Sequence, residues 1–198
     1  MPISITYSAR KAKKGCLGAL TAFLLFSFVA SSHAHDLVWP GEKLKLMFSQ
    51  AESFEQKNLY VSDEQRSNIE KILGSVLPDE DLKPSIYLAV VRSAPDSPPR
   101  KAAAMMFIDA HGEGGKIEMG VVVSGKGEIM NVHIFENKES EKLLQPQFLK
   151  QFENKKSSDL FKVGADISAP AGREKSAQEI ASGARRGLLI INEMFRKR

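Results

Sequence analysis

Cysteine and histidine are scarce in this 198-residue sequence. The single cysteine, Cys16, lies in an N-terminal segment that we expect to be removed, so disulfides, thiolate metal sites and cysteine nucleophiles are excluded from the rest. The four histidines form no metal motif such as HExxH. No Ser-His-Asp arrangement and no glycosidase carboxylate pair stands out either. The sequence therefore favours neither a metal centre nor a hydrolase.

An amino-terminal histidine is the one arrangement that would favour a metal. Cleavage after Ala34 would leave His35 at the N-terminus, where its amino group and imidazole could chelate copper. A second histidine would have to come close, and the candidates are His111 and His133. His133 alternates with apolar neighbours, which predicts that it points from the exposed face of a strand. We interpret the three histidines as unrelated and expect no metal.

The first 34 residues have the pattern of a secretory signal. Four basic residues at positions 10–14 precede an uncharged, nearly all-apolar run over 17–30, and Ser32-His33-Ala34 suits signal cleavage. This predicts a signal peptide over 1–34 and a soluble domain over 35–198, exported to a bacterial periplasm. The alternative is an uncleaved anchor on the outer face of the cytoplasmic membrane, since the uncharged stretch 15–34 could span a thin bilayer.

Excess charge of one sign is absent once that segment is set aside. Four of the 28 basic residues and none of the 24 acidic ones lie in the first 34 positions, so 24 of each remain. The basicity of the whole chain thus belongs to the targeting segment, and we expect no nucleic-acid partner. The remainder has the size of one domain.

Hydrophobic periodicity predicts an α+β fold, with helices before and after an antiparallel sheet of about four strands. The first helices are expected over 41–58 and from a capping box at Ser62 to Pro78. The expected strands are 85–92, 102–110, 117–124 and 128–136, the last three joined by tight hairpins.

Two further helical segments are expected after the sheet. A short one begins near Pro146 and turns Phe148, Leu149 and Phe152 inward. The last helix runs from about Glu174 to Phe195. Its expected buried stripe comprises Ile180, Ala184, Leu188, Ile191 and Phe195.

The segment before and into that last helix, residues 164–187, reads GADISAPAGREKSAQEIASGARRG. It resembles the FMN-binding domain of sodium-translocating NADH:quinone oxidoreductases and Rnf electron-transport complexes, and most closely its free-standing, signal-bearing members. In that family an SGAT loop precedes the last helix, and its threonine is esterified to the FMN phosphate. Asp166, Gly172, Ser176 and Gly183 take the family's aspartate, loop glycine, closing hydroxyl and helix glycine. Weaker similarities are Gln151-Phe152, Phe135-Glu136 and Asp109-Ala110-His111.

The chain departs from the family at the chemical centre. SGAT becomes Ala171-Gly172-Arg173-Glu174, and a glutamate cannot carry a phosphoester. We expect Glu174 to cap the helix and take the place of the phosphate. Ser176 is a poor substitute because it points roughly 200° around the helix axis from Glu174. The resemblance therefore implies Gly172, Arg173, Glu174 and Ser176 as cofactor-binding residues, with FMN held non-covalently if at all and no covalent FMN.

Two functions follow from this resemblance. One is an exported electron-transfer protein that exchanges electrons with membrane redox proteins through FMN. The other is a flavin-free descendant that keeps the fold as a binding or assembly module. Both favour a carrier or binding module over an enzyme with its own substrate.

Overall fold

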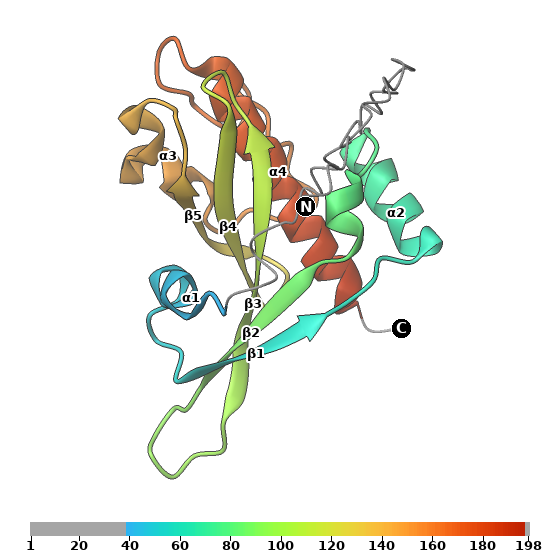
Figure 1. The fold of residues 1–198 in the computed structure, drawn as a ribbon, viewed down its shortest axis with the longest axis vertical. Helices are drawn as coiled ribbons and strands as arrows, with labels where there is room; N and C mark the ends of the chain where they lie inside the picture. Colours follow the sequence, from blue (N-terminus) through green and yellow to red (C-terminus); the bar gives the residue numbers. More distant parts are fainter. Residues whose placement is uncertain (1–38, 197–198) are drawn as a thin grey trace, which may run out of the picture. The chain divides into compact units, whose positions relative to one another are not determined.

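The structure, a computed structural model, describes residues 39–196. The expected signal peptide over 1–34 and His35 lie outside the described residues. The described part is an α+β domain around one antiparallel sheet of five strands, in chain order β1 to β5 (Figure 1). No helix among residues 39–196 is long and apolar enough to cross a membrane. The predicted fold class is confirmed, with one strand more than expected.

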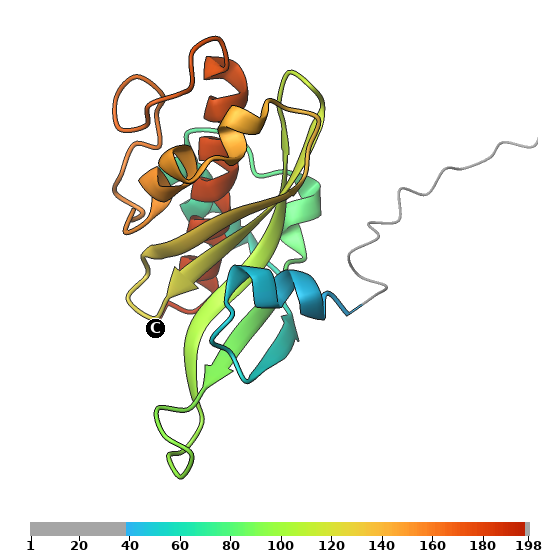
Figure 2. The ribbon, with the colours of Figure 1, turned by 90° about the vertical axis from the view of Figure 1, so that its left-hand side faces the viewer.

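Four of the five strands coincide with the predicted ones. They are β2 (Ser85–Val91), β3 (Arg100–His111), β4 (Lys116–Ser124) and β5 (Ile129–Glu136). The two tight turns form as expected, with Gly112 N–H donating to Gly115 O and Gly127 N–H to Ser124 O, each at 2.9 Å. The longer loop between β2 and β3 extends away from the sheet (Figures 1 and 2).

The predicted helix over 41–58 is wrong in its second half. Helix α1 covers only Gly41–Met47, and residues Ser53–Asn58 form β1, an edge strand paired with β2. Phe54 is the only residue of β1 that is not exposed. Its polar neighbours show no apolar alternation, so the sequence gives no strand signal. Pairing with β2 therefore overrides local propensity.

Helix α2 (Asp63–Leu73) begins as predicted and ends earlier. Ser62 Oγ accepts from Gln65 N–H at 3.3 Å, and the Gln65 side chain accepts from Ser62 N–H at 2.9 Å. The helix stops at Gly74 and not at Pro78, so Val76 is 72% exposed. A short 3-10 helix, η2 (Asp79–Leu82), then leads into β2.

Helix α4 (Glu174–Met194) lies along one face of the sheet, which carries the larger part of the core (Figures 1 and 2). A Cβ at Gly183 would lie 2.9 Å from Met119 Sδ, and one at Gly187 would lie 3.0 Å from Val121 Cγ2. These two glycines therefore allow the close contact between α4 and β4. The predicted stripe is buried at Ile180, Ala184, Leu188 and Ile191.

The prediction that Phe195 belongs to the buried stripe is wrong, because Phe195 is 45% exposed. It follows the last residue of α4, where the chain leaves the sheet. The short helical segment after β5 is confirmed as α3 (Pro146–Leu149) followed by η4 (Lys150–Phe152), after the 3-10 helix η3 (Glu141–Leu144). Phe148 and Phe152 are buried in the same core as α4.

A buried ion pair fixes the middle of α4. Arg186 Nε lies 2.8 Å from the Asp81 carboxylate, and Arg186 also donates to Asp109 O at 2.6 Å. Burial raises the pKa of Asp81 to about 6, and the Arg186 charge partly opposes that rise. The pair therefore joins α4 to η2 and β3.

The opposite face of the sheet is covered by α1 (Figure 2). This face is rich in aromatic rings. Neighbouring rings are in contact along a row: Trp39, Tyr87, Phe107, Phe135 and His133. The ring of His133 lies 4.6 Å from that of Phe135, and burial lowers its pKa. His133 is thus half-buried on this face and not freely exposed as expected, whereas His111 is exposed. Residues 39–196 contain no group of three or more side chains suited to a metal.

Candidate functional site

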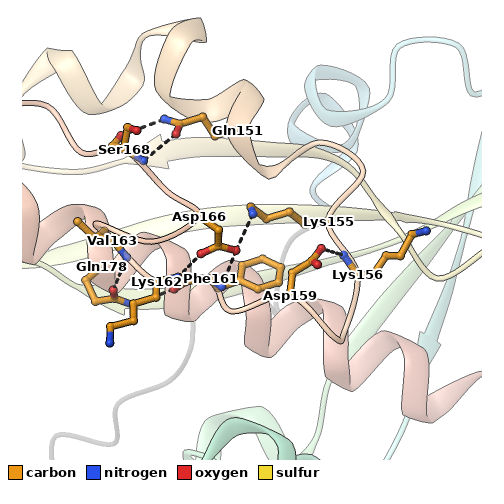
Figure 3. Close-up of polar contacts among 10 residues, drawn as sticks. All are labelled: Gln151, Lys155, Lys156, Asp159, Phe161, Lys162, Val163, Asp166, Ser168 and Gln178. Carbon is orange, nitrogen blue, oxygen red and sulfur yellow. Dashed lines mark hydrogen bonds and ion pairs between the residues drawn. The ribbon is translucent and has the colours of Figure 1, made fainter.

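The loop that leads into α4 is organised by Asp166, the aspartate matched to the FMN-binding family (Figure 3). One carboxylate oxygen accepts from Lys162 N–H at 2.7 Å. The other accepts from Phe161 N–H at 3.1 Å and from Lys155 Nζ at 2.8 Å. Phe161 is buried at φ +52°, a conformation that L-residues rarely adopt, and these bonds hold it there.

The charge state of Asp166 agrees with a structural role. Burial alone would raise the pKa of its carboxyl group, but the hydrogen bonds from Lys155, Lys162 and Phe161 outweigh burial and hold the pKa below its ordinary value. The carboxylate is therefore ionised at neutral pH and its oxygens are occupied by three donors. It closes the loop and does not face a ligand.

Two glutamines attach this loop to its surroundings (Figure 3). Gln178 on α4 accepts from Val163 N–H at 2.9 Å and donates to Phe161 O at 3.0 Å. Gln151 on η4 accepts from Ser168 N–H at 2.7 Å and donates to Ser168 O at 3.0 Å. The resemblance singles out Gln151, but sequence reasoning missed Gln178. Its signal was a polar residue next to the apolar stripe of the last helix.

Three of the four predicted cofactor-binding residues lie together at the start of α4. Gly172, Arg173 and Glu174 are all exposed, and Gly172 has φ +73°. Glu174 Oε1 accepts from Gly172 N–H at 3.1 Å. Its own backbone N–H and that of Gly172 lower the pKa of Glu174. Glu174 is the first residue of the helix, and the residue before it, Arg173, makes no side-chain cap. The expected capping thus takes a different form, in which the carboxylate binds the loop amide.

Ser176, the fourth predicted residue, lies on the other side of the helix and is fully buried. Its Oγ accepts from Glu113 N–H at 2.9 Å and donates to Glu139 Oε2 at 2.8 Å. The other oxygen of Glu139 accepts from Gly114 N–H at 2.6 Å. Ser176 therefore ties α4 to the β3–β4 turn, and the structure does not bring it together with Glu174.

Two of the groups that could donate to a phosphate at this end of α4 are already hydrogen-bonded within the protein. The amide of Gly172 is bonded to Glu174, and the hydroxyl of Ser176 is engaged twice. Two pockets lie elsewhere. One of about 820 Å³ lies at the C-terminal end of α4, and one of about 530 Å³ lies between the end of α2, residues 160–162 and the middle of α4. Neither is lined by any of the four predicted residues.

Comparison with protein-family models and with curated proteins finds no match. No protein-family model matches the chain, and no curated protein aligns with it at a significant level. The similarity to the FMN-binding domain therefore rests on the residues themselves and their order.

Proposed function

We propose that this protein is an exported, flavin-free binding module on a fold like that of the FMN-binding domain. The observation that carries the proposal is the hydrogen bond between the Glu174 carboxylate and Gly172 N–H. Glu174 stands where the family has its flavin-bearing threonine. The loop amide is thus satisfied by the chain itself, and a phosphate there would meet a carboxylate at the positive end of the helix dipole.

The nearest hydroxyl group, that of Ser176, also supports the absence of a covalent flavin. Ser176 could replace the threonine only by turning out of the core and releasing Glu113 N–H and Glu139. Such a turn breaks two part-buried hydrogen bonds, which is costly. A phosphoester at Ser176 is therefore disfavoured as well.

An electron carrier with non-covalent FMN, serving membrane redox proteins, is the second candidate. It is favoured by Gly172, whose φ of +73° gives the loop a conformation that suits close approach of the backbone to a ligand. Arg173 and Lys175 are also exposed and make no ion pair with any described residue, so they could offset part of a phosphate charge.

The visible absorbance of protein purified from its native compartment separates the two candidates. We expect no flavin band, and no fluorescent band under ultraviolet light on a denaturing gel even after co-expression with a flavin transferase. Absorbance that disappears on denaturation would favour the non-covalent carrier. A fluorescent gel band from the wild-type protein would contradict the proposal and direct attention to Ser176.

A gain-of-function variant tests the role of Glu174 directly. The double variant Glu174→Thr/Arg173→Ala restores a hydroxyl before the helix, and we expect a fluorescent gel band when it is co-expressed with the transferase. Glu153→Thr adds a hydroxyl at an exposed glutamate on another segment and serves as the matched control. Equal labelling of both variants would show that the loop position has no special role.

A further inference from the structure

The pocket at the C-terminal end of α4 is a feature that the resemblance leaves unexplained. Its walls are Leu88 of β2, the first residues of β3, the β4–β5 turn, residues 156–158, and the C-terminal end of α4 with Phe195 after it. Its volume of about 820 Å³ lies within the range of small-molecule sites.

The apolar part of this lining is mostly aliphatic. Leu88 and Ile191 are buried core residues, whereas Ala104 is partly exposed. Phe195 adds a large apolar side chain that is 45% exposed beside the pocket. Apolar surface that is open to water gains from being covered by an apolar ligand.

The charged residues that line the pocket are all basic. Lys101, Lys126 and Lys156 line the pocket, and no Asp or Glu does. Lys101 pairs with Glu55 at 3.0 Å and Lys156 with Glu128 at 3.1 Å, but both lysines are more than half exposed, so these pairs are weak. Lys126 makes no ion pair within the part of the chain that the structure describes. An anionic group is therefore favoured here.

The dipole of α4 works against that preference. The C-terminal end of a helix carries about half a negative charge and disfavours nearby anions. Lys126 makes no ion pair within residues 39–196, and its full charge exceeds this partial charge, so the pocket remains favourable for an anion. The polar groups of the wall are mostly used within the protein, since Asn192 donates to Gly127 O at 3.1 Å and to Ser157 Oγ at 3.0 Å.

We propose that this pocket binds a single-chain amphiphile with an anionic headgroup. The acyl chain would cover the aliphatic wall, and the headgroup would lie among the three lysines. A carboxylate and a phosphate share this chemistry, because lysine acts as a point charge towards both. The inference rests on the proposed function as a binding module and names the class of its ligand.

The test is a titration of the purified protein, followed by the NMR amide signals of the pocket wall at Gly125, Gly127, Ser157 and Ser158. The probes are oleate, oleoyl lysophosphatidate and oleyl alcohol, each below its aggregation concentration. We expect saturable shifts with at least one anionic probe, and the tighter of the two identifies the headgroup. The affinity of the anion should fall with added salt, whereas that of the alcohol should not.

Charge reversal tests the lysines. Lys126→Glu/Lys156→Glu should weaken binding of the anionic probe by about tenfold or more and change binding of the alcohol by less than about threefold. Lys71→Glu, at an exposed lysine of α2, is the matched control and should bind like the wild type. Phe195→Ser, at an exposed position, should weaken all three probes alike.

Two results would overturn the inference. They are the absence of saturable shifts with both anionic probes, and unchanged affinity of the anionic probe in the double lysine variant. Failure here is distinguishable from failure of the proposed function, which is read from flavin absorbance and not from lipid binding.

Discussion

The two ends of α4 are attached to the sheet in the same way, but their surroundings differ. At each end one polar side chain ties the helix to a tight turn of the sheet, Ser176 to the β3–β4 turn and Asn192 to the β4–β5 turn. At the N-terminal end, Gly114 N–H and Ser176 Oγ donate to Glu139, and Gly172 N–H donates to Glu174. The C-terminal end opens into a pocket of about 820 Å³. The similarity in sequence thus marks the closed end, and the space for a ligand lies at the other.

Side-chain size and charge account for this difference. At the closed end two carboxylates reach backbone amides, so the loop satisfies its own hydrogen bonds. At the open end the turn is Gly125-Lys126-Gly127, where Ser124 Oγ accepts from Lys126 N–H at 3.2 Å and the lysine is exposed. The first end is suited to stability and the second to binding.

Shortening a buried side chain in the middle of α4 should have the largest effect on stability, because the position of both helix ends depends on the packing of its middle. Leu188 is fully buried in the main core, so Leu188→Ala should lower the free energy of unfolding by roughly 2–5 kcal/mol. Ile72→Ala, at an α2 side chain that is 45% exposed, is the control and should cost about 1 kcal/mol or less. Denaturant unfolding measures both. An unchanged midpoint for Leu188→Ala would mean that the buried face of α4 is wrongly assigned.

The two attachment residues provide a matched pair of smaller effect. Ser176→Ala removes the hydrogen bonds of a fully buried hydroxyl to Glu113 N–H and to one oxygen of the partly buried Glu139, and should cost roughly 1–3 kcal/mol. Asn192→Ala should cost about 0.5–1.5 kcal/mol, because water in the pocket can reach the groups it releases. The same unfolding measurement ranks them. A larger loss for Asn192→Ala would reverse the assignment of the closed and open ends.

The sequence predicted what periodicity and turn chemistry control. Four strands, two tight turns, the capping box at Ser62 and the buried stripe of α4 all follow from local patterns. Strand β1 could not be predicted, because its mostly polar residues lack the apolar alternation of a strand. Only the pairing with β2 defines it. The exposure of Phe195 could not be predicted either, because it depends on where the sheet ends beneath the helix.

The four candidate site residues were chosen from the sequence, and that they bind a cofactor stays a prediction; their arrangement could be predicted only in part. The spacing correctly indicated that Glu174 and Ser176 point to different sides of α4. The partners of Ser176 come from the β3–β4 turn and from Glu139, which are distant in sequence and leave no local signal. The same holds for the pocket, whose walls come from five separate segments.

The smallest expected effect is at Glu174, which is fully exposed, and it needs a local readout. Its pKa is lowered in the folded protein, so its contribution to stability is present at neutral pH and is lost as the pH falls through the folded pKa. The NMR signal of Gly172 N–H should follow that titration, with a midpoint below the ordinary glutamate value, because the amide donates to the carboxylate. Glu174→Gln should abolish the transition, whereas Glu153→Gln should preserve it. Inorganic phosphate should leave the Gly172 signal of the wild type unchanged. A Gly172 amide that ignores Glu174 and responds to phosphate would show that the loop is open to an anion, and the contrast between the two ends of α4 would fail.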